Sequence, residues 1–307
     1  MAQEGGLMSE YHVPVMLKEC MEGLHIIPDG VYVDVTFGGG GHSREILKNL
    51  GEGGRLLAFD QDEDAKKNIP NDDRLTFIDQ NFRFLKNYCR LHSAMQVDGI
   101  LADLGVSSHQ FDQPERGFST RFDADLDMRM DQSAPITAKE VIASYSEEEL
   151  HRIFGMYGEI QNAKSLARTL VTARLNRQID TIAEFKEVIK KLIPKGKENK
   201  YLAQAFQALR IEVNQELEAL QEFLLQAADV LKPGGRLVVM SYHSLEDRLV
   251  KNFIAKGKFR GELEKDFYGN IQRPLDAVTR KAVVATDEEI ALNSRARSAK
   301  LRVAVKL

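Results

Sequence analysis

One stretch restricts the fold more than any other: VYVDVTFGGGGHS, residues 31–43. Val31, Val33 and Val35 alternate with polar residues, which predicts a β-strand, and the strand runs into four glycines. Residues 44–50 then have the apolar spacing of a helix. Strand, glycine turn and helix start predict a ligand-binding corner, because glycines let the backbone approach a ligand and the helix offers free N–H groups. A turn without function is the alternative for a glycine run alone.

A second apolar run, residues 55–60, ends in the carboxylate of Asp60. It lies about 20 residues beyond the glycines, where an acidic side chain accepts hydrogen bonds from the ribose of an adenosine-containing cofactor. The spacing favours this role for Asp60. The alternative is that Asp60 caps a helix starting near Asp62.

The remaining pattern predicts an α/β protein with an insertion. Strands are expected at 75–78, 99–104, within 231–244 and at 301–307, with helices between the early ones. Between residues 107 and 210 there are only helical patterns: 138–145, 147–156, 163–175, 181–193 and 202–211. Capping boxes are predicted at Ser146 with Glu149 and at Thr181 with Glu184. We therefore expect a flexible tail at 1–10, a Rossmann-like domain from 11–106 and 213–307, and an inserted all-helical domain at 107–212.

Composition narrows the environment and the partners. Hydrophobic residues make up 43% and charged residues 29% of the chain, as in soluble globular proteins. The sequence has no membrane-length apolar run or signal peptide, and its two cysteines build no disulfide framework, which predicts a cytoplasmic protein. The net charge is −4, yet residues 248–307 carry 14 Lys or Arg against 7 Asp or Glu. This basic segment suggests a surface for a polyanion, with solvated charge as the alternative.

The chemistry is expected where the parallel strands end. Asp103 closes the fourth predicted strand, opposite the glycine turn, and is the predicted catalytic acid; a turn or N-cap role is its alternative. Phe82 is placed to pack against a planar ring, although core packing also explains a single Phe. His243 and Asp247 could pair, but without a nucleophile elbow they do not indicate a hydrolase triad. No histidine spacing indicates a metal, and no phosphate loop indicates ATP or GTP hydrolysis.

These residues alone leave several functions open. A nicotinamide-dependent oxidoreductase and a methyltransferase would share the glycine corner and Asp60. A non-catalytic assembly factor that keeps the cofactor site only structurally is a third hypothesis, which the acid at Asp103 disfavours.

Several motifs together resemble one family, the MraW/RsmH family of bacterial S-adenosylmethionine-dependent (cytosine-N4)-methyltransferases of small-subunit (16S) ribosomal RNA. They are HVPVML (12–17), DVTFGGGGHS (34–43), FDQD (59–62), DGILADLGVSSHQFD (98–112), RGFS (116–119), LDMRMD (126–131), FQALRIEVNQEL (206–217), SYHSLEDRLVK (241–251) and NSRARSAKLR (293–302). The resemblance spans nearly the whole chain, and DLGVSS, LDMRMD and HSLEDR are far more specific than a glycine loop.

The resemblance implies a Rossmann-like class I methyltransferase fold, S-adenosylmethionine as cofactor and small-subunit ribosomal RNA or the 30S particle as partner, with a homodimer left open. The expected target is a cytosine of the decoding region. Asp103 is expected to accept a hydrogen bond or proton from the N4 amine. The expected cofactor residues are Gly38, Gly40, Gly41, His42, Asp60, Phe82, Asp103 and Gln110. The expected RNA-binding residues are Ser107, Ser108, Arg129, Tyr242, His243, Arg295 and Arg297.

Two departures from the family pattern bear on the details. Members often carry a His-Pro-Ala-Thr-like run before Phe-Gln-Ala-Leu-Arg, where this chain has KYLAQA at 200–205. Amino-group methyltransferases commonly place Pro-Pro-Tyr after the acid or Asn, and here the run is DLGV at 103–106. The aromatic platform for the base must then come from elsewhere, with Phe111, Phe118 and Tyr242 as candidates.

Overall fold

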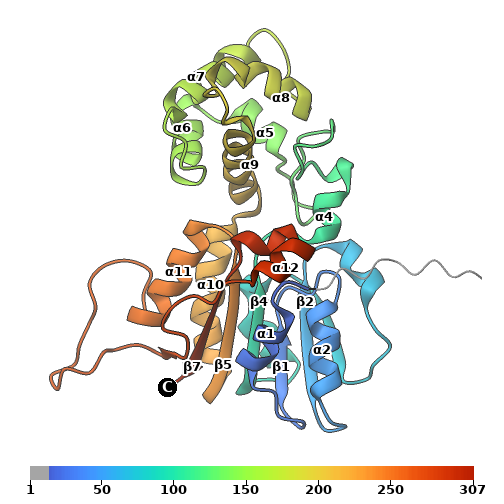
Figure 1. The fold of residues 1–307 in the computed structure, drawn as a ribbon, viewed down its shortest axis with the longest axis vertical. Helices are drawn as coiled ribbons and strands as arrows, with labels where there is room; N and C mark the ends of the chain where they lie inside the picture. The colour runs from blue at the N-terminus through green and yellow to red at the C-terminus, as the bar shows by residue number, and fades with distance from the viewer. Residues whose placement is uncertain (1–13) are drawn as a thin grey trace, which may run out of the picture.

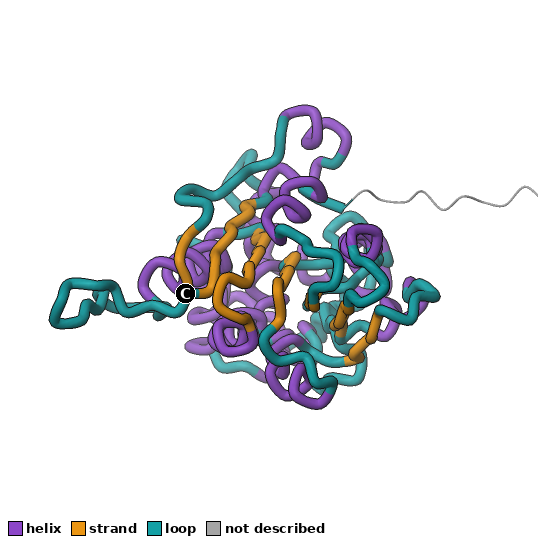
Figure 2. Tube along the Cα trace, turned by 90° about the horizontal axis from the view of Figure 1, so that it is seen from below, coloured by secondary structure: helices purple, strands orange, loops and turns teal. Residues whose placement is uncertain are grey.

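The computed structural model describes residues 14–307, so the predicted tail at 1–10 and the first residues of the HVPVML motif lie outside it. Its described strands form one seven-stranded sheet in the order β3-β2-β1-β4-β5-β7-β6 (Figures 1 and 2). The bounds are β1 (Val31–Asp34), β2 (Arg55–Asp60), β3 (Leu75–Asp79), β4 (Val97–Asp103), β5 (Leu231–Ser241), β6 (Leu275–Ala277) and β7 (Lys300–Lys306). Neighbours from β3 to β5 are parallel, whereas β7 is antiparallel to β5 and β6. The predicted Rossmann-like fold is confirmed.

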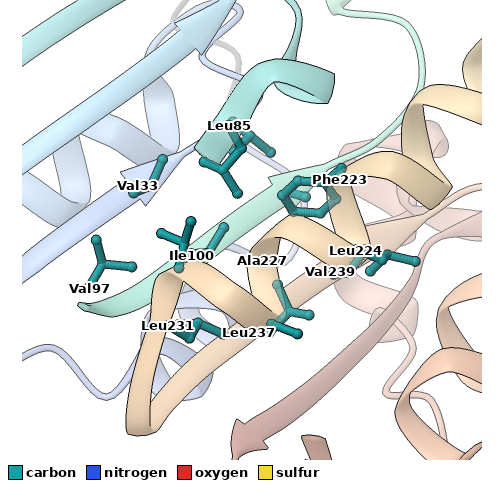
Figure 3. Packing of buried hydrophobic residues seen from close by; sticks show 14 of the residues in the cluster. Val33, Leu85, Val97, Ile100, Phe223, Leu224, Ala227, Leu231, Leu237 and Val239 are labelled. Carbon is teal, nitrogen blue, oxygen red and sulfur yellow. The ribbon is translucent and has the colours of Figure 1, made fainter. Parts of the chain in front are cut away.

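Helices cover both faces of the sheet because the strand residues alternate between two cores. One core combines Val33 and Ile100 with α3 (Leu85–Leu91), α10 (Glu216–Val230) and α11 (Ser244–Lys256). Figure 3 shows Phe223 of α10 among Leu85, Val33 and Ile100. The other core combines strand residues such as Tyr32 with α1 (Leu17–Leu24) and α2 (Gly41–Asn49). The sheet is therefore buried on both sides, as a parallel sheet requires.

The helical part between β4 and α10 has a core of its own and lies beyond the carboxyl ends of the strands (Figure 1). Its helices are α4 (Ser108–Asp112), α5 (Ala138–Ser144), α6 (Glu147–Met156), α7 (Ala163–Arg174), α8 (Ile182–Ile189) and α9 (Glu198–Asn214). The capping boxes predicted at Ser146 and Thr181 are both present. They fix where α6 and α8 begin, since each cap satisfies N–H groups that the helix leaves free.

Some boundaries differ from the sequence prediction. The first helix was expected to begin at Pro14, but Met16 adopts a left-handed conformation (φ 50°) and α1 starts at Leu17. The helix expected at 65–68 is a 3-10 helix, Glu63–Asn68. Strand β6 was not predicted, because three residues carry no readable alternation. Residues 257–274, which connect α11 to β6, project from the body of the molecule (Figures 1 and 2).

No helix among residues 14–307 is long and apolar enough to cross a membrane. Both cysteines, Cys20 and Cys89, are buried and unpaired. Each therefore serves as a small apolar residue in one of the two sheet cores.

The packing predicts a large loss of stability when the Phe223 side chain of α10 is removed. Phe223 is fully buried, so Phe223→Ala should lower the free energy of unfolding by about 3–5 kcal/mol. Leu225 is 52% exposed on the same helix, and Leu225→Ala should change it by less than about 0.5 kcal/mol. Urea unfolding at 25 °C measures both, and equal losses would contradict this packing.

Candidate functional site at the carboxyl edge of the sheet

Asp34, the last residue of β1, holds the glycine turn. It is 1% exposed, and its carboxylate accepts hydrogen bonds from the Ser43 hydroxyl (2.7 Å) and the Thr36 N–H (3.1 Å). Burial raises the pKa of Asp34. These two bonds tie the end of β1 to the first turn of α2, so the glycines between them have a defined path.

The turn needs glycine at two positions for steric reasons. Gly40 has φ 74° and precedes α2, and a Cβ there would lie 2.8 Å from the Phe37 ring. A Cβ on Gly41 would lie 2.2 Å from Pro14 Cγ. Gly39 instead faces open space, which leaves room for a ligand against the turn.

Asp60 lies at the end of β2, beside this turn. Its Oδ2 accepts the Gly38 N–H (2.7 Å) and its Oδ1 accepts the Asp62 N–H (2.9 Å). Burial raises its pKa to about 6. The alternative that Asp60 caps the next helix is wrong, because Asp62 is the N-cap of Glu63–Asn68 and accepts the Asp64 N–H.

Asp103, at the end of β4, is positioned by three neighbours. Its N–H donates to Thr36 Oγ1 (2.7 Å), and its Oδ1 accepts the Tyr242 hydroxyl (2.7 Å). Its Oδ2 lies 3.8 Å from His42 Nδ1, and the side chain is 25% exposed. Burial raises the pKa of Asp103 to about 6, while His42 and Tyr242 act in the opposite direction. The carboxylate therefore keeps one oxygen with no hydrogen-bond partner among the described residues.

Tyr242 can reach Asp103 because Gly105 leaves space for its ring. A Cβ on Gly105 would lie 3.3 Å from the Tyr242 ring, and φ is 98° at this glycine. Tyr242 directly follows β5, the parallel neighbour of β4. The ends of β1, β4 and β5 thus meet around one carboxylate.

A cavity of about 410 Å³, partly open to solvent, adjoins Asp103 through Leu104 and Gly105. The Phe82 ring is its aromatic wall and packs edge-on against Phe223, with centroids 5.4 Å apart. The lining is Thr36, Gln61, Asn81, Phe82, Leu104, Gly105, Met130, Asn214, Glu216, Ala219, Leu220 and Glu246. The walls thus come from the sheet edge, from α10 and α11, and from the helical part.

Sequence reasoning singled out only Phe82 among these lining residues as a site residue. Met130, Asn214 and Glu216 lie inside the LDMRMD and FQALRIEVNQEL motifs, which were a signal for them. Nothing in the sequence indicated that these motifs would face Phe82.

Gln110 belongs to a second, smaller cluster behind the glycine turn. Its side chain donates to Asp62 Oδ2 (2.7 Å) and closes a capping box with Ser107 at the start of α4. Arg116 also donates to Asp62 (2.9 Å). A cavity of about 210 Å³ lies here, lined by Gly38, Asp60, Asp62, Asp64, Ala65, Asn68, Ser107 and His109. Of the predicted cofactor residues, Phe82 therefore lines the first cavity, and Gly38 and Asp60 line the second.

The predicted RNA-binding residues occupy different surroundings. Ser107 and Ser108 start α4 at the edge of the sheet, next to the second cavity. Arg129 is engaged in its own loop, where its guanidinium donates twice to Asp127 (2.8 Å each). Arg295 and Arg297 lie on the 3-10 helix Ser294–Ser298, just before β7.

Of the three aromatic platform candidates, only Tyr242 contacts Asp103. Phe118 is buried in the core of the helical part, so its ring is not available to stack on a base. Phe111 packs under the guanidinium groups of Arg121 and Arg295.

His243 does not pair with Asp247, which binds Arg302 instead (2.7 Å). With Glu216 and Glu246 it forms a group whose ligand atoms lie within 4.8 Å of one another. Both Glu216 oxygens accept from Arg210, and His243 Nδ1 accepts the Glu246 N–H. His243 Nε2 lies 3.1 Å from Glu246 but makes no hydrogen bond among the described residues. Because Arg210 already compensates the charge of Glu216, and His243 serves as the N-cap of α11, these contacts explain the group without a metal.

The site can thus bind a cationic ligand and withdraw a proton. Asp34, Asp60 and Asp103 are held by N–H and hydroxyl donors, and no Lys or Arg in the described chain pairs with them. Their negative charge remains available to a ligand. A carboxylate with a pKa near 6 is mostly ionised at neutral pH and accepts a proton readily.

Comparison with known proteins gives a consistent result. A family model described as the MraW methylase family matches residues 9–307. The chain is 60% identical to ribosomal RNA small subunit methyltransferase H of Flavobacterium johnsoniae, covering 97% of this chain and 98% of the relative. It is 59% identical to the protein of the same name from Bacteroides fragilis, covering 96% and 97%. A solved structure described as a putative rRNA-methylase from Clostridium thermocellum is 14% identical, with a TM-score of 0.44 over 96% of this chain and 100% of that one.

The raised pKa predicts that Asp103 costs stability at neutral pH. The folded state binds the proton more tightly than the unfolded chain, so stability falls as pH rises from about 4 to about 6. Asp103→Asn cannot titrate and should be more stable than wild type by about 1–3 kcal/mol at pH 8, with the difference shrinking toward zero at pH 4. Urea unfolding at both pH values tests this. The exposed Asp73→Asn is the control, and a pH-independent difference for Asp103→Asn would refute the prediction.

Proposed function

The chain belongs to the MraW methylase family, and from this premise we propose that it methylates the exocyclic N4 of a cytosine in the decoding region of small-subunit ribosomal RNA. S-adenosylmethionine is the methyl donor. The observation that carries the proposal for this chain's own residues is Asp103 beside the glycine turn, with its carboxylate held by the Tyr242 hydroxyl and its backbone N–H held by Thr36.

The residues present fit this cofactor. The larger cavity has an apolar wall at Phe82 and Leu220 and amide groups at Gln61 and Asn81, the mixture of surfaces that a nucleoside needs. Asp60 retains lone pairs for ribose hydroxyls beyond its two backbone bonds. When bound, the cofactor supplies an electrophilic methyl group on a sulfonium, a cation that the surrounding carboxylates favour.

The chemical difficulty lies in the base, because the lone pair of a cytosine N4 amine is delocalised into the ring. In the proposed mechanism Asp103 Oδ2 accepts one N4–H, which localises the lone pair for in-line attack on the methyl carbon. With the cofactor bound, its sulfonium would supply the methyl group and leave as the neutral thioether, and Asp103 would receive the proton that the amine loses. His42 Nδ1 lies 3.8 Å from this oxygen, and its ring forms the wall of the site beside Asp103.

Tyr242 is a positioning residue in this mechanism. Its hydroxyl holds Oδ1, so the carboxylate cannot rotate and Oδ2 faces the incoming amine. The target base must be unpaired and turned out of its stack to reach this depth. We propose different roles for the two parts of the chain. Residues 11–106 and 213–307 bind the cofactor, and residues 107–212 recognise the RNA.

Place of action and assembly are part of the same proposal. We place the enzyme in the cytoplasm, where its two buried thiols would stay reduced. A homodimer is an open question that sedimentation equilibrium of the purified chain answers directly.

Asp103→Asn should reduce methyl transfer by a factor of about 10²–10⁴, because the amide cannot accept the proton. Transfer of a tritiated methyl group to small subunits from a strain lacking the enzyme measures this. Cofactor affinity, measured by calorimetry, should stay within about fivefold of wild type. Normal turnover by the variant would remove Asp103 from catalysis, and absent transfer by wild type would favour an assembly factor. Tighter binding of NAD than of S-adenosylmethionine would favour an oxidoreductase.

The pH profile should follow the same carboxylate. With wild type, kcat/KM should rise with pH to a plateau with a midpoint near 6, the pKa of Asp103. Tyr242→Phe removes a hydrogen bond that stabilises the ionised form, so the midpoint should move to higher pH. An unchanged midpoint in Tyr242→Phe, or a flat wild-type profile between pH 5 and 8, would contradict the assignment.

A further inference from the structure

Two guanidinium groups pack against one aromatic ring where α4 meets the segment before β7. Arg295 lies over the Phe111 ring at 5.2 Å from its centroid, and Arg121 lies over the same ring at 5.5 Å. Such contacts hold planar cations in place because the ring face is negative. The pair joins the two parts of the molecule: Phe111 and Arg121 belong to the helical part, and Arg295 precedes β7.

Some of the N–H donors of Arg295 are unused. Its Nη2 donates to Asp112 Oδ1 (3.0 Å), whereas its Nη1 is buried and has no hydrogen-bond partner among the described residues. A guanidinium carries five N–H donors, and leaving one buried without an acceptor is costly. The side chain as a whole is 28% exposed, so a ligand can reach the guanidinium at its exposed atoms, and a small shift of the side chain would bring Nη1 to it.

The charges around the ring do not balance. Asp112 pairs with Arg295, but within residues 14–307 Arg121 forms no ion pair. Two cations therefore share one carboxylate. A bound anion would relieve the repulsion and accept the unused N–H groups.

A short path through the structure connects Arg295 to the proposed reaction centre. Lys300, which follows the 3-10 helix of Arg295, pairs with Ser241 at the end of β5. The next residue, Tyr242, donates to Asp103. Figure 1 shows α4 and α12 (Asp287–Leu292) next to one another above the sheet, and the Arg295–Asp112 contact joins these two regions.

We propose that Arg295 and Arg121, stacked on Phe111, bind a phosphodiester of the RNA backbone next to the target cytosine. This inference rests on the proposed function. Arginine suits the role because its planar fork matches two phosphate oxygens and keeps its charge at any working pH. A backbone phosphate held at the rim fixes the register of the strand, so that the base turned toward Asp103 is the correct one. Phe111 then supports the arginines and is not the platform for the base.

The protein side of the test neutralises each arginine in the full-length enzyme. Arg295→Gln should lower kcat/KM on small subunits about 10- to 100-fold, mostly through KM, as expected for a lost charge-assisted bond. Arg121→Gln, on the surface, should act in the same direction with a smaller loss. Arg295→Lys keeps the charge but not the fork and should fall between wild type and Arg295→Gln. Arg90→Gln, exposed at the far end of α3, is the matched control and should leave kcat/KM unchanged.

The RNA side neutralises single phosphates. A fragment of decoding-region RNA carries one methylphosphonate at each position flanking the cytosine in turn, and its affinity is measured by fluorescence anisotropy over a salt series. At one position, the methylphosphonate should weaken binding by the wild type but not binding by Arg295→Gln. The slope of log affinity against log salt concentration should be smaller by about one for Arg295→Gln.

The proposal is overturned if, at every phosphate position, the loss of affinity from the methylphosphonate adds to the loss from Arg295→Gln. It is also overturned if Arg295→Gln lowers kcat with unchanged KM and salt slope. Cofactor affinity and melting temperature of each variant exclude misfolding. Because the binding experiment requires no methyl transfer, a failure of the proposed reaction would be seen separately in wild type.

Discussion

The N–H of Asp103 donates to Thr36 Oγ1 over 2.7 Å, and this bond joins the two strand ends on which the site depends. It can form because β1 and β4 are parallel neighbours, with Asp34 opposite Leu101. The strand order places this pair where the chain changes from adding strands on one side of β1 to adding them on the other. Open α/β sheets bind ligands at such a point, since the loops diverge there. The glycine turn and the acid thus meet as a consequence of topology.

The acids of the site differ from other buried acids in how their charge is stabilised. Asp62 and Asp247 are paired with Arg116 and Arg302, so their charge is already compensated. Asp103, by contrast, has only a tyrosine hydroxyl and a nearby imidazole, and burial raises its pKa. An unpaired buried carboxylate destabilises the fold, and the protein tolerates this where a cationic ligand or a proton is to be received. Because Asp103 has no Lys or Arg partner, it lowers the stability of the fold and at the same time accepts a proton more readily.

Local patterns in the sequence predicted most elements, because the strands alternate and the helices carry their own caps. Asp60 and Asp103 were predictable as site residues from their place at strand ends. The cavity wall at Met130 and Asn214 was not, because it depends on how two separate cores meet. Arg129 was predicted to bind RNA, yet its guanidinium binds Asp127 two residues away, a local competition that spacing cannot reveal. Phe111 was considered as a platform because the DLGV run after Asp103 has no aromatic residue. Its stacking on arginines could not be predicted, since Arg121 and Arg295 lie far apart in sequence.

The placement of the helical part between Asp103 and Leu231 also has a consequence for folding. Strands β4 and β5 are hydrogen-bonded neighbours, yet the whole helical part is synthesised between them. Closing a disordered loop of that length would be slow and entropically unfavourable. Because the helical part has its own core, it can collapse first and bring its two ends together, which shortens the effective loop. During translation the strands β1 to β4 would then wait, with one edge unpaired, until these helices have packed and β5 can dock.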